Sequence, residues 1–186
     1  MLIIARFAIR GNLSSAKGSI IPVMSVAVEQ ITYLREAVDR LRAALGDDLI
    51  GVVLYGSHAR GEAREDSDVD LLVIARDLPE RRYDRSVRLQ SVFQGIKDAP
   101  DFSVLGKTPE EFESYFPSLY LDIGLDGVVL HDRGGYVAGK LKRIREIIAH
   151  TGLVRLRLDR NNMFWNWDRK VTRPWEITWE GFRELA

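Results

Sequence analysis

Apolar and polar residues follow one another along the chain in patterns that predict helices and strands. A first segment repeats its apolar residues at intervals of three and four, which predicts a helix with one face toward a core: Ile31, Leu34, Val38, Leu41 and Leu45. Two short β-branched apolar runs, residues 49–55 and 69–75, predict buried strands. Residues 56–68 between them are polar and contain glycine, so they cannot form a core and are expected to be a loop that begins with a helical turn.

A second helix is expected after the second strand. The segment Asp77–Glu80 supplies a cap residue, an early proline and an acid three positions on, which together are typical of a helix start. We expect this helix to run to about residue 97, with Tyr83, Val87 and Ile96 among its inward side chains.

The next segments continue the alternation of strands and helices. Residues 101–105 predict a third strand, and Thr108, Pro109 and Glu111 mark a helix start with a capping box. A strand over 127–130 and a helix over about 136–150 follow. The pattern predicts an α/β (α+β) fold with a small mixed sheet and helices packed against it.

The end of the chain differs from what precedes it. Val154, Leu156 and Leu158 alternate with arginines, which predicts a strand with one wet, basic face. Four tryptophans lie among polar residues after it: Trp165, Trp167, Trp175 and Trp179. We therefore divide the chain into an N-terminal extension (1–23), a main domain (24–152) and a basic, β-leaning C-terminal extension (153–186).

Composition narrows the classes of protein. The chain has 186 residues, of which 46% are hydrophobic, enough to bury one core. The absence of cysteine excludes a disulfide scaffold, a cysteine nucleophile and a cysteine-ligated metal. No apolar run reaches the roughly 18 residues that cross a bilayer, so we expect a cytoplasmic protein without a membrane span. The first 28 residues lack acids, but arginines interrupt their apolar run, so we expect an extension or an alternative start at Met24 rather than a secretory signal.

Charge is balanced overall but uneven along the chain. The 27 basic and 27 acidic residues cancel, yet the last 54 positions carry 12 basic and six acidic residues. Such asymmetry fits an acidic catalytic part and a basic docking part, or simply an arginine-rich solvated face. Tryptophan and arginine together could stack RNA bases, but the net charge of zero and the lack of an RNA-binding module argue against a nucleic-acid partner.

The chemistry-bearing residues flank the polar loop. Gly56 and Ser57 end the first buried strand, where exposed backbone N–H groups and a hydroxyl suit a phosphate. Asp68 and Asp70 stand at i and i+2 of the next strand, so both carboxylates project from one face. Two carboxylates beside a phosphate favour Mg²⁺. The alternative is a turn glycine, a capping serine and two solvated acids.

A third carboxylate would allow two metal ions about 3.5–4 Å apart to flank a displacement at phosphorus. Asp101 opens the third predicted strand and is the candidate, with Asp98 as its rival. In the loop, Arg60 is a candidate to neutralise charge on the phosphates, and Ser67 is a candidate to orient the loop. The alternatives are a solvated arginine and a turn hydroxyl.

The segment LYGSHARGEAREDSDVDLLVI resembles the polymerase-beta-like nucleotidyltransferase superfamily, especially its stand-alone minimal nucleotidyltransferases. The resemblance covers roughly residues 31–132. It implies Mg²⁺-dependent transfer of a nucleoside monophosphate from an NTP, by default ATP, with release of pyrophosphate. Gly56 and Ser57 would then hold the triphosphate, Asp68 and Asp70 would bind metal, and Asp101 would complete the metal site and help to deprotonate the attacking hydroxyl.

The acceptor is open at this level. The resemblance implies first a protein acceptor, such as a helical HEPN ribonuclease toxin that an antitoxin of this kind inactivates by adding AMP to a tyrosine. A small molecule such as an antibiotic is the alternative acceptor. A non-catalytic nucleotide- or partner-binding module is a further alternative, which the intact Gly56–Ser57 pair and both acids disfavour.

Overall fold

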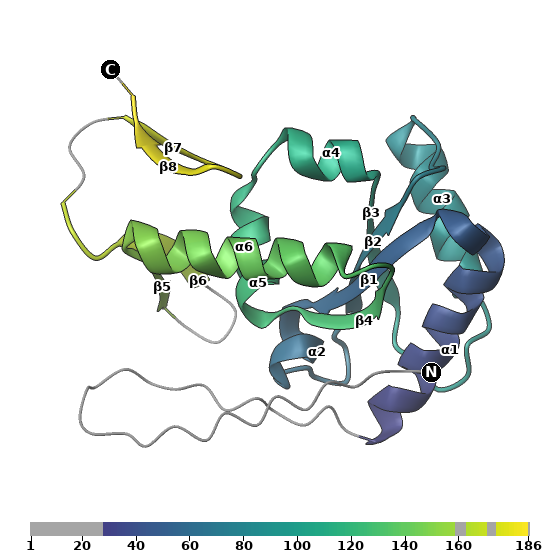
Figure 1. Ribbon diagram of the computed structural model, residues 1–186. Helices are drawn as coiled ribbons and strands as arrows, with labels where there is room; N and C mark the ends of the chain where they lie inside the picture. Colours follow the sequence, from purple (N-terminus) through teal and green to yellow (C-terminus); the bar gives the residue numbers. More distant parts are fainter. Residues whose placement is uncertain (1–27, 159–162, 171–173, 186) are drawn as a thin grey trace.

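A four-stranded mixed sheet forms the centre of the molecule (Figure 1). The structure is a computed structural model that describes residues 28–158, 163–170 and 174–185. The sheet has the order β3-β2-β1-β4 and consists of β1 (Leu49–Tyr55), β2 (Val69–Ala75), β3 (Phe102–Lys107) and β4 (Val128–Asp132). β1 runs antiparallel to β2 and β4, whereas β2 and β3 are parallel, so the predicted mixed sheet is confirmed.

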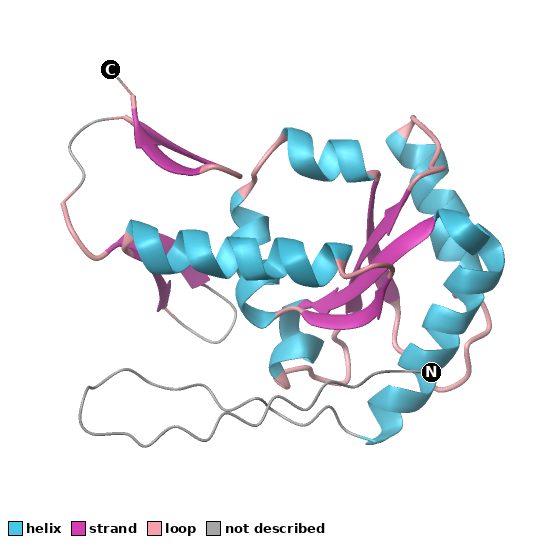
Figure 2. Ribbon diagram, in the orientation of Figure 1, coloured by secondary structure: helices cyan, strands magenta, loops and turns pink. Residues whose placement is uncertain are grey.

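Helices cover both faces of this sheet (Figure 2). α1 (Val28–Leu45) and α3 (Arg82–Val92) pack on one face, and α1 leads through the 3₁₀ turn η1 (Gly46–Asp48) into β1. α4 (Pro109–Ser114), α5 (Ser118–Asp126) and α6 (Tyr136–Thr151) pack on the other face. The short helix α2 (Gly56–Arg60) follows β1 directly. None of the helices in the described part of the chain is long and apolar enough to cross a membrane.

The sheet separates two hydrophobic clusters because neighbouring strand residues point to opposite faces. In β2, Leu71 and Val73 pack with α1 and α3, while Leu72 and Ile74 pack with α4, α5 and α6. All four side chains are completely buried. A strand buried on both faces reads as a continuous apolar run, which is why the sequence pattern located β1 and β2 so closely.

The C-terminal extension consists of two hairpins. β5 (Leu153–Arg157) pairs with β6 (Met163–Trp167), and β7 (Trp175–Thr178) pairs with β8 (Gly181–Glu184). Side chains from both hairpins pack against the cluster that α4, α5 and α6 form: Trp165, Trp167, Ile177 and Trp179. The predicted N-terminal extension, residues 1–23, lies outside the described residues.

The helix expected from Asp77 is shorter than predicted and has a different inward face. α3 begins at Arg82, and Tyr83 and Val87 are 78% and 50% exposed. Its buried side chains are instead Arg85 and Leu89, while Ile96 is buried after the helix has ended. The prediction was wrong because it assigned inward positions to apolar residues only, whereas the buried position one turn before Leu89 is held by an arginine paired with Glu111.

The predicted wet, basic face of β5 is wrong at Arg155, whereas Arg157 is exposed as predicted. Leu156 and Leu158 are exposed, and the side chain of Arg155 is only 8% exposed. Arg155 points inward because Asp122 and Asp126 of α5 bind its guanidinium. Alternation showed that the two faces differ, but it could not show which face meets acids.

Two further comparisons with the sequence concern α4 and α5. The Thr108 hydroxyl accepts a hydrogen bond from the backbone N–H of Glu111 at 3.2 Å, and the Glu111 carboxylate accepts one from the backbone N–H of Thr108 at 3.1 Å. The predicted capping box at the start of α4 is therefore confirmed. α5 was not predicted; its N-cap is Pro117, which offers no side-chain hydrogen bond as a start signal.

Candidate active site

The candidate site lies where β1 ends and β2 and β3 begin. Antiparallel pairing sets Tyr55 opposite Asp70, and Gly56 continues from Tyr55 into α2. Parallel pairing sets Asp70 opposite Ser103 of β3. The register of three strands therefore brings the two ends of the polar loop, residues 56–68, to the same edge of the sheet.

Gly56 and Asp70 are in very close contact. Gly56 has φ +71°, a conformation that residues with a Cβ rarely adopt. A Cβ at this position would stand 2.1 Å from Oδ2 of Asp70. Glycine is thus required both by the backbone conformation and by the space that the Asp70 carboxylate occupies.

Asp70 is half-buried, and its surroundings act on its pKa in both directions. Burial raises the pKa of Asp70 above its ordinary value, and the negative charge of Asp68 adds to that rise. The hydrogen bond with Ser103 and the positive influence of His58 and Arg60 lower it in part. The net direction is upward because burial outweighs these favourable partners. A cation at this carboxylate would lower its pKa again.

Asp68 and Asp101 precede β2 and β3 and are both exposed. The backbone carbonyl of Asp101 accepts a hydrogen bond from the N–H of Val69 at 2.7 Å, so the two strand starts are tied together. Among the described residues, however, no three His, Asp or Glu side chains form a group that could hold a metal ion, and the structure therefore does not assemble Asp68, Asp70 and Asp101 into a three-carboxylate cluster. The rival Asp98 is exposed in a turn with φ +56°.

The loop after α2 is held by its own hydrogen bonds. The Ser57 carbonyl accepts from the N–H of Glu62 at 2.9 Å. The Ser67 hydroxyl accepts from the N–H of Arg64 at 2.8 Å, which makes it a turn hydroxyl. The buried His58 donates from Nε2 to the Ser67 carbonyl at 3.0 Å and so ties α2 to the far end of the loop. Ser67 and His58 thus shape the loop.

Arg60 lies at the end of α2 and is engaged by acids. Its Nε donates to Glu62 at 2.9 Å, and its Nη1 lies 3.6 Å from Asp126 at the end of α5. The alternative of a freely solvated arginine therefore does not hold, because the side chain is only 18% exposed. The charged partners of the Arg60 side chain in this structure are therefore Glu62 and Asp126.

Comparisons with known proteins identify the family of the chain. Residues 33–124 match the family model described as the nucleotidyltransferase domain. A relative from Methanocaldococcus jannaschii, named "Putative protein adenylyltransferase MJ1305", is 36% identical over 121 residues, which cover 62% of this chain and 80% of the relative. The chain belongs to the nucleotidyltransferase family. It is a nucleotidyltransferase enzyme, as the resemblance predicted.

Other relatives of this nucleotidyltransferase match at lower coverage or identity. A second protein from the same organism, MJ0141, carries the same name and is 38% identical over 52 residues, 28% of this chain and 52% of the relative. A solved toxin–antitoxin structure with AMP-PNP is 18% identical, covers 63% of this chain and 87% of that one, and has a TM-score of 0.48. A structure described as a Shewanella oneidensis HEPN toxin in complex with an MNT antitoxin is 17% identical. It covers 66% of this chain and 88% of that one, with a TM-score of 0.43.

The candidate site of this nucleotidyltransferase offers oxygen ligands of the kind that Mg²⁺ prefers. Mg²⁺ is commonly bound by one or two carboxylates together with substrate phosphates. Asp68 and Asp70 are two carboxylates close enough for the charge of Asp68 to raise the pKa of Asp70, a rise that is caused first by burial. The residues present therefore fit one Mg²⁺, while a second ion would depend on Asp101.

Two features of the site escaped the sequence. Ser103 lies opposite Asp70 and bonds its carboxylate, and only the strand register reveals this. Of the two arginines of β5, Arg157 reaches the loop after α2 and binds Glu62. The uneven charge along the chain was the one signal that the C-terminal extension meets an acidic surface.

Proposed function

We propose that this nucleotidyltransferase transfers AMP from ATP to a hydroxyl of an acceptor protein. The observation that carries the proposal is the pair Asp68 and Asp70 beside Gly56–Ser57, with Asp70 in contact with Gly56. The name of the 36% identical relative, a protein adenylyltransferase, supports both the adenylyl group and the protein acceptor.

The proposed reaction transfers one adenylyl group. The acceptor oxygen forms a bond to the α-phosphorus of ATP, the bond between that phosphorus and the bridging oxygen of the β-phosphate breaks, and pyrophosphate leaves. The proton of the acceptor hydroxyl passes to a base, for which Asp101, exposed at the start of β3, is the candidate. When bound, Mg²⁺ would neutralise charge on the phosphate oxygens.

Metal binding, phosphate binding and charge neutralisation are proposed for different residues of the site. Asp68 and Asp70 would hold Mg²⁺, and Ser103 orients Asp70 through its hydrogen bond. The hydroxyl and backbone N–H of Ser57 would bind the triphosphate, and the lack of a side chain at Gly56 lets the phosphates come close to the carboxylates. Arg60 is charged and within electrostatic reach of Asp70, so it would oppose negative charge that develops on the phosphates.

A HEPN-type ribonuclease is the first acceptor to test, because the sequence resembles the minimal nucleotidyltransferases that pair with such toxins. The protein should be incubated with Mg²⁺, α-labelled ATP and either a purified HEPN protein or a lysate. The Asp68→Asn variant should lose labelling by on the order of 100-fold or more, since the metal loses one of its two carboxylates. The matched control is Asp66→Asn, which removes an exposed acid from the same loop.

The outcomes separate the possible acceptors. A labelled protein band that Asp68→Asn loses and Asp66→Asn keeps would support protein adenylylation. Label that appears only in the small-molecule fraction would overturn the protein acceptor and favour an antibiotic or metabolite. An absence of transfer with a retained affinity for ATP would favour a nucleotide-binding module.

A further inference from the structure

A continuous group of ion pairs joins the loop after α2 to the C-terminal extension. Its members come from α2 and its loop, from α5 and from β5, and they balance three cations against three acids: Arg60, Arg155 and Arg157 with Glu62, Asp122 and Asp126. Within this group, Arg60 is the member that belongs to α2, the helix that leads directly from β1 into the candidate site.

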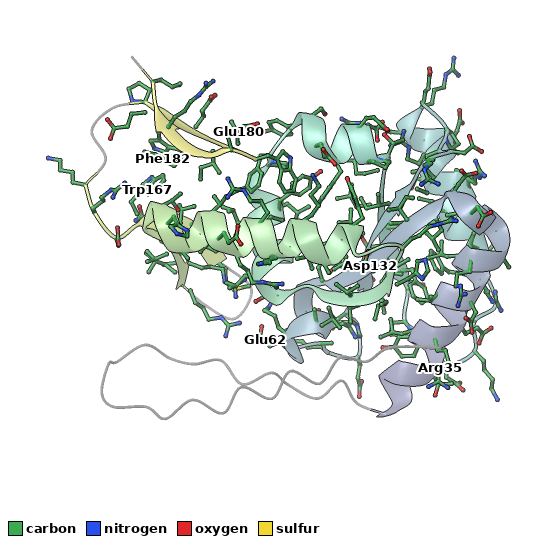
Figure 3. The ribbon with its side chains drawn as sticks, viewed as in Figure 1. Arg35, Glu62, Asp132, Trp167, Glu180 and Phe182 are labelled. Carbon is green, nitrogen blue, oxygen red and sulfur yellow. The ribbon has the colours of Figure 1, made fainter. Side chains whose placement is uncertain are left out.

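Glu62 is shared between Arg60 and Arg157. Nη2 of Arg157 lies 2.6 Å from both carboxylate oxygens, and Nε of Arg60 lies 2.9 Å from Oε2. The hydrogen bond from Arg157 is the largest cause that holds the pKa of Glu62 below its usual value, and the bond from Arg60 contributes less. Figure 3 shows Glu62 beside α2. Arg157 is therefore the stronger partner of this carboxylate.

Asp126 is shared in the same way between Arg60 and Arg155. The guanidinium of Arg155 donates to both oxygens of Asp126, at 2.5 and 2.9 Å, whereas Arg60 comes no nearer than the 3.6 Å ion pair. Arg155 also donates to Asp122 at 3.2 Å, and the indole of Trp165 donates to the same oxygen at 3.1 Å. Each carboxylate that Arg60 touches is thus held more closely by an arginine of β5.

Arg60 pairs with these acids and also acts on the candidate site. It ends the helix that Gly56 and Ser57 begin, and its positive charge lowers the pKa of Asp70. A triphosphate bound at Ser57 would compete with Glu62 and Asp126 for this guanidinium. Because Arg60 and Asp126 are largely buried, the competition takes place where charges are less screened than in water.

We propose that Arg155 and Arg157 are positioning residues for nucleotide binding: they neutralise Asp126 and Glu62, so that Arg60 can turn from these carboxylates to the triphosphate. This inference rests on the proposed function, because it requires ATP at Gly56–Ser57. It assigns the C-terminal extension a role in the reaction of the main domain. Without the β5 arginines, Glu62 and Asp126 would have Arg60 as their remaining arginine partner and would hold it away from the nucleotide.

The test measures nucleotide affinity in the full chain with Mg²⁺ and AMP-PNP as the probe. The variant Arg157→Gln leaves Glu62 to Arg60 alone and is expected to weaken binding by about fivefold, the effect of one partly exposed ion pair. In the transfer assay it should raise KM for ATP and leave kcat within about twofold. Arg157 is chosen because its side chain is more exposed than that of Arg155, so its replacement spares the fold.

Two further variants distinguish positioning from mere support of the fold. Glu62→Gln combined with Arg157→Gln removes the competing acid and should restore the affinity to within about twofold of the parent. Arg183→Gln is the matched control, because it removes an arginine of the same extension that pairs with Glu176 of the neighbouring strand. Its affinity for AMP-PNP should equal that of the parent.

The outcomes are separable from those of the proposed function. Weakened binding in Arg157→Gln with recovery in the double variant would support the inference. Parent-like binding in Arg157→Gln would overturn it while the parent still binds and transfers. A loss of affinity that Glu62→Gln does not restore would also overturn it. So would an equal loss when Arg157→Gln is introduced into a chain that already carries Arg60→Gln. A parent chain that fails to bind AMP-PNP would overturn the proposed function and this inference together.

Discussion

Gly56 and Asp70 lie so close together that a Cβ on residue 56 would clash with the Asp70 carboxylate, at 2.1 Å from Oδ2. The two residues belong to different segments, the start of α2 and the strand β2, and the pairing of Tyr55 with Asp70 brings them together. The carboxylate that is expected to bind metal is therefore positioned directly by the backbone that is expected to bind phosphate.

The first prediction concerns this contact. Gly56→Ala should lower transfer by on the order of 100-fold, because the displaced Asp70 carboxylate would misplace the metal. It should also cost about 1–3 kcal/mol of stability from the positive φ. Labelling with α-labelled ATP and urea unfolding measure the two effects.

Gly95→Ala is the control for that experiment. Gly95 has φ +74°, close to the value at Gly56, but a Cβ there would meet nothing within 4 Å. It should lose similar stability and keep its transfer activity. Equal activity in the two variants would show that the contact with Asp70 does not matter.

The second prediction follows from the raised pKa of Asp70. A carboxyl whose pKa is higher in the folded than in the unfolded chain binds its proton more tightly when folded, so the free energy of unfolding falls as the pH rises through that range. In metal-free buffer Asp70→Asn should therefore melt at a higher temperature than the parent at pH 7. This gain should shrink as the pH falls toward the ordinary carboxyl range. Thermal unfolding in EDTA at several pH values measures it, and a variant less stable than the parent at every pH would contradict the pKa direction.

The third prediction concerns the buried arginine of α3. Arg85 is 6% exposed, donates to both oxygens of Glu111 at 2.5 and 2.9 Å, and donates to the carbonyl of Pro79 at 2.9 Å. Arg85→Ala should cost about 2–3 kcal/mol of stability, since it leaves these acceptors without their donor. Arg82→Ala, an exposed arginine of the same helix, should change stability by less than about 0.5 kcal/mol. Urea unfolding compares them, and equal midpoints would refute the structural role of Arg85.

The fourth prediction concerns the contact of the second C-terminal hairpin with the main domain. Trp179 packs against Phe112 and Phe116, with ring centroids 5.2 and 5.0 Å apart, and its indole donates to the Phe112 carbonyl at 3.2 Å. Trp179→Ala should cost about 3 kcal/mol of stability. Trp175→Ala, at a tryptophan that is 43% exposed, should cost clearly less. A single unfolding transition that shifts by the same amount in both variants would show that Trp179 does not anchor this hairpin.

Local patterns were sufficient to locate the strands of the sheet and to name candidate residues for the site. The runs over 49–55 and 69–75 coincide with β1 and β2 because both strands are buried on two faces and leave little doubt in the sequence. The strand alternation also predicted that Asp68 and Asp70 share a face. The helix α3 was misjudged where a buried position holds Arg85, because an ion pair with Glu111, 26 residues away, makes a charged residue suitable there.

The C-terminal extension shows most clearly what local sequence patterns cannot predict, namely the partners of a charged side chain. The alternation in β5 predicted two unlike faces but assigned the arginines to water, whereas Asp122 and Asp126 turn Arg155 inward. The pairing of Arg60 with Asp126 could not be predicted either, because the two residues lie 66 positions apart in the chain. No local pattern encodes which distant segment will supply a counter-ion.

The sequence by itself determined the family of the chain and the candidate residues for its chemistry, because the glycine, the serine and the two aspartates are recognised by spacing along one loop and alternation along one strand. The tertiary structure alone decided what surrounds that chemistry. Strand register selected Ser103 as the neighbour of Asp70, and folding brought Asp126 of α5 next to both Arg60 and Arg155. The physical reason is that covalent neighbours fix direction and spacing, whereas the charge and burial at a side chain depend on segments that meet only when the chain folds.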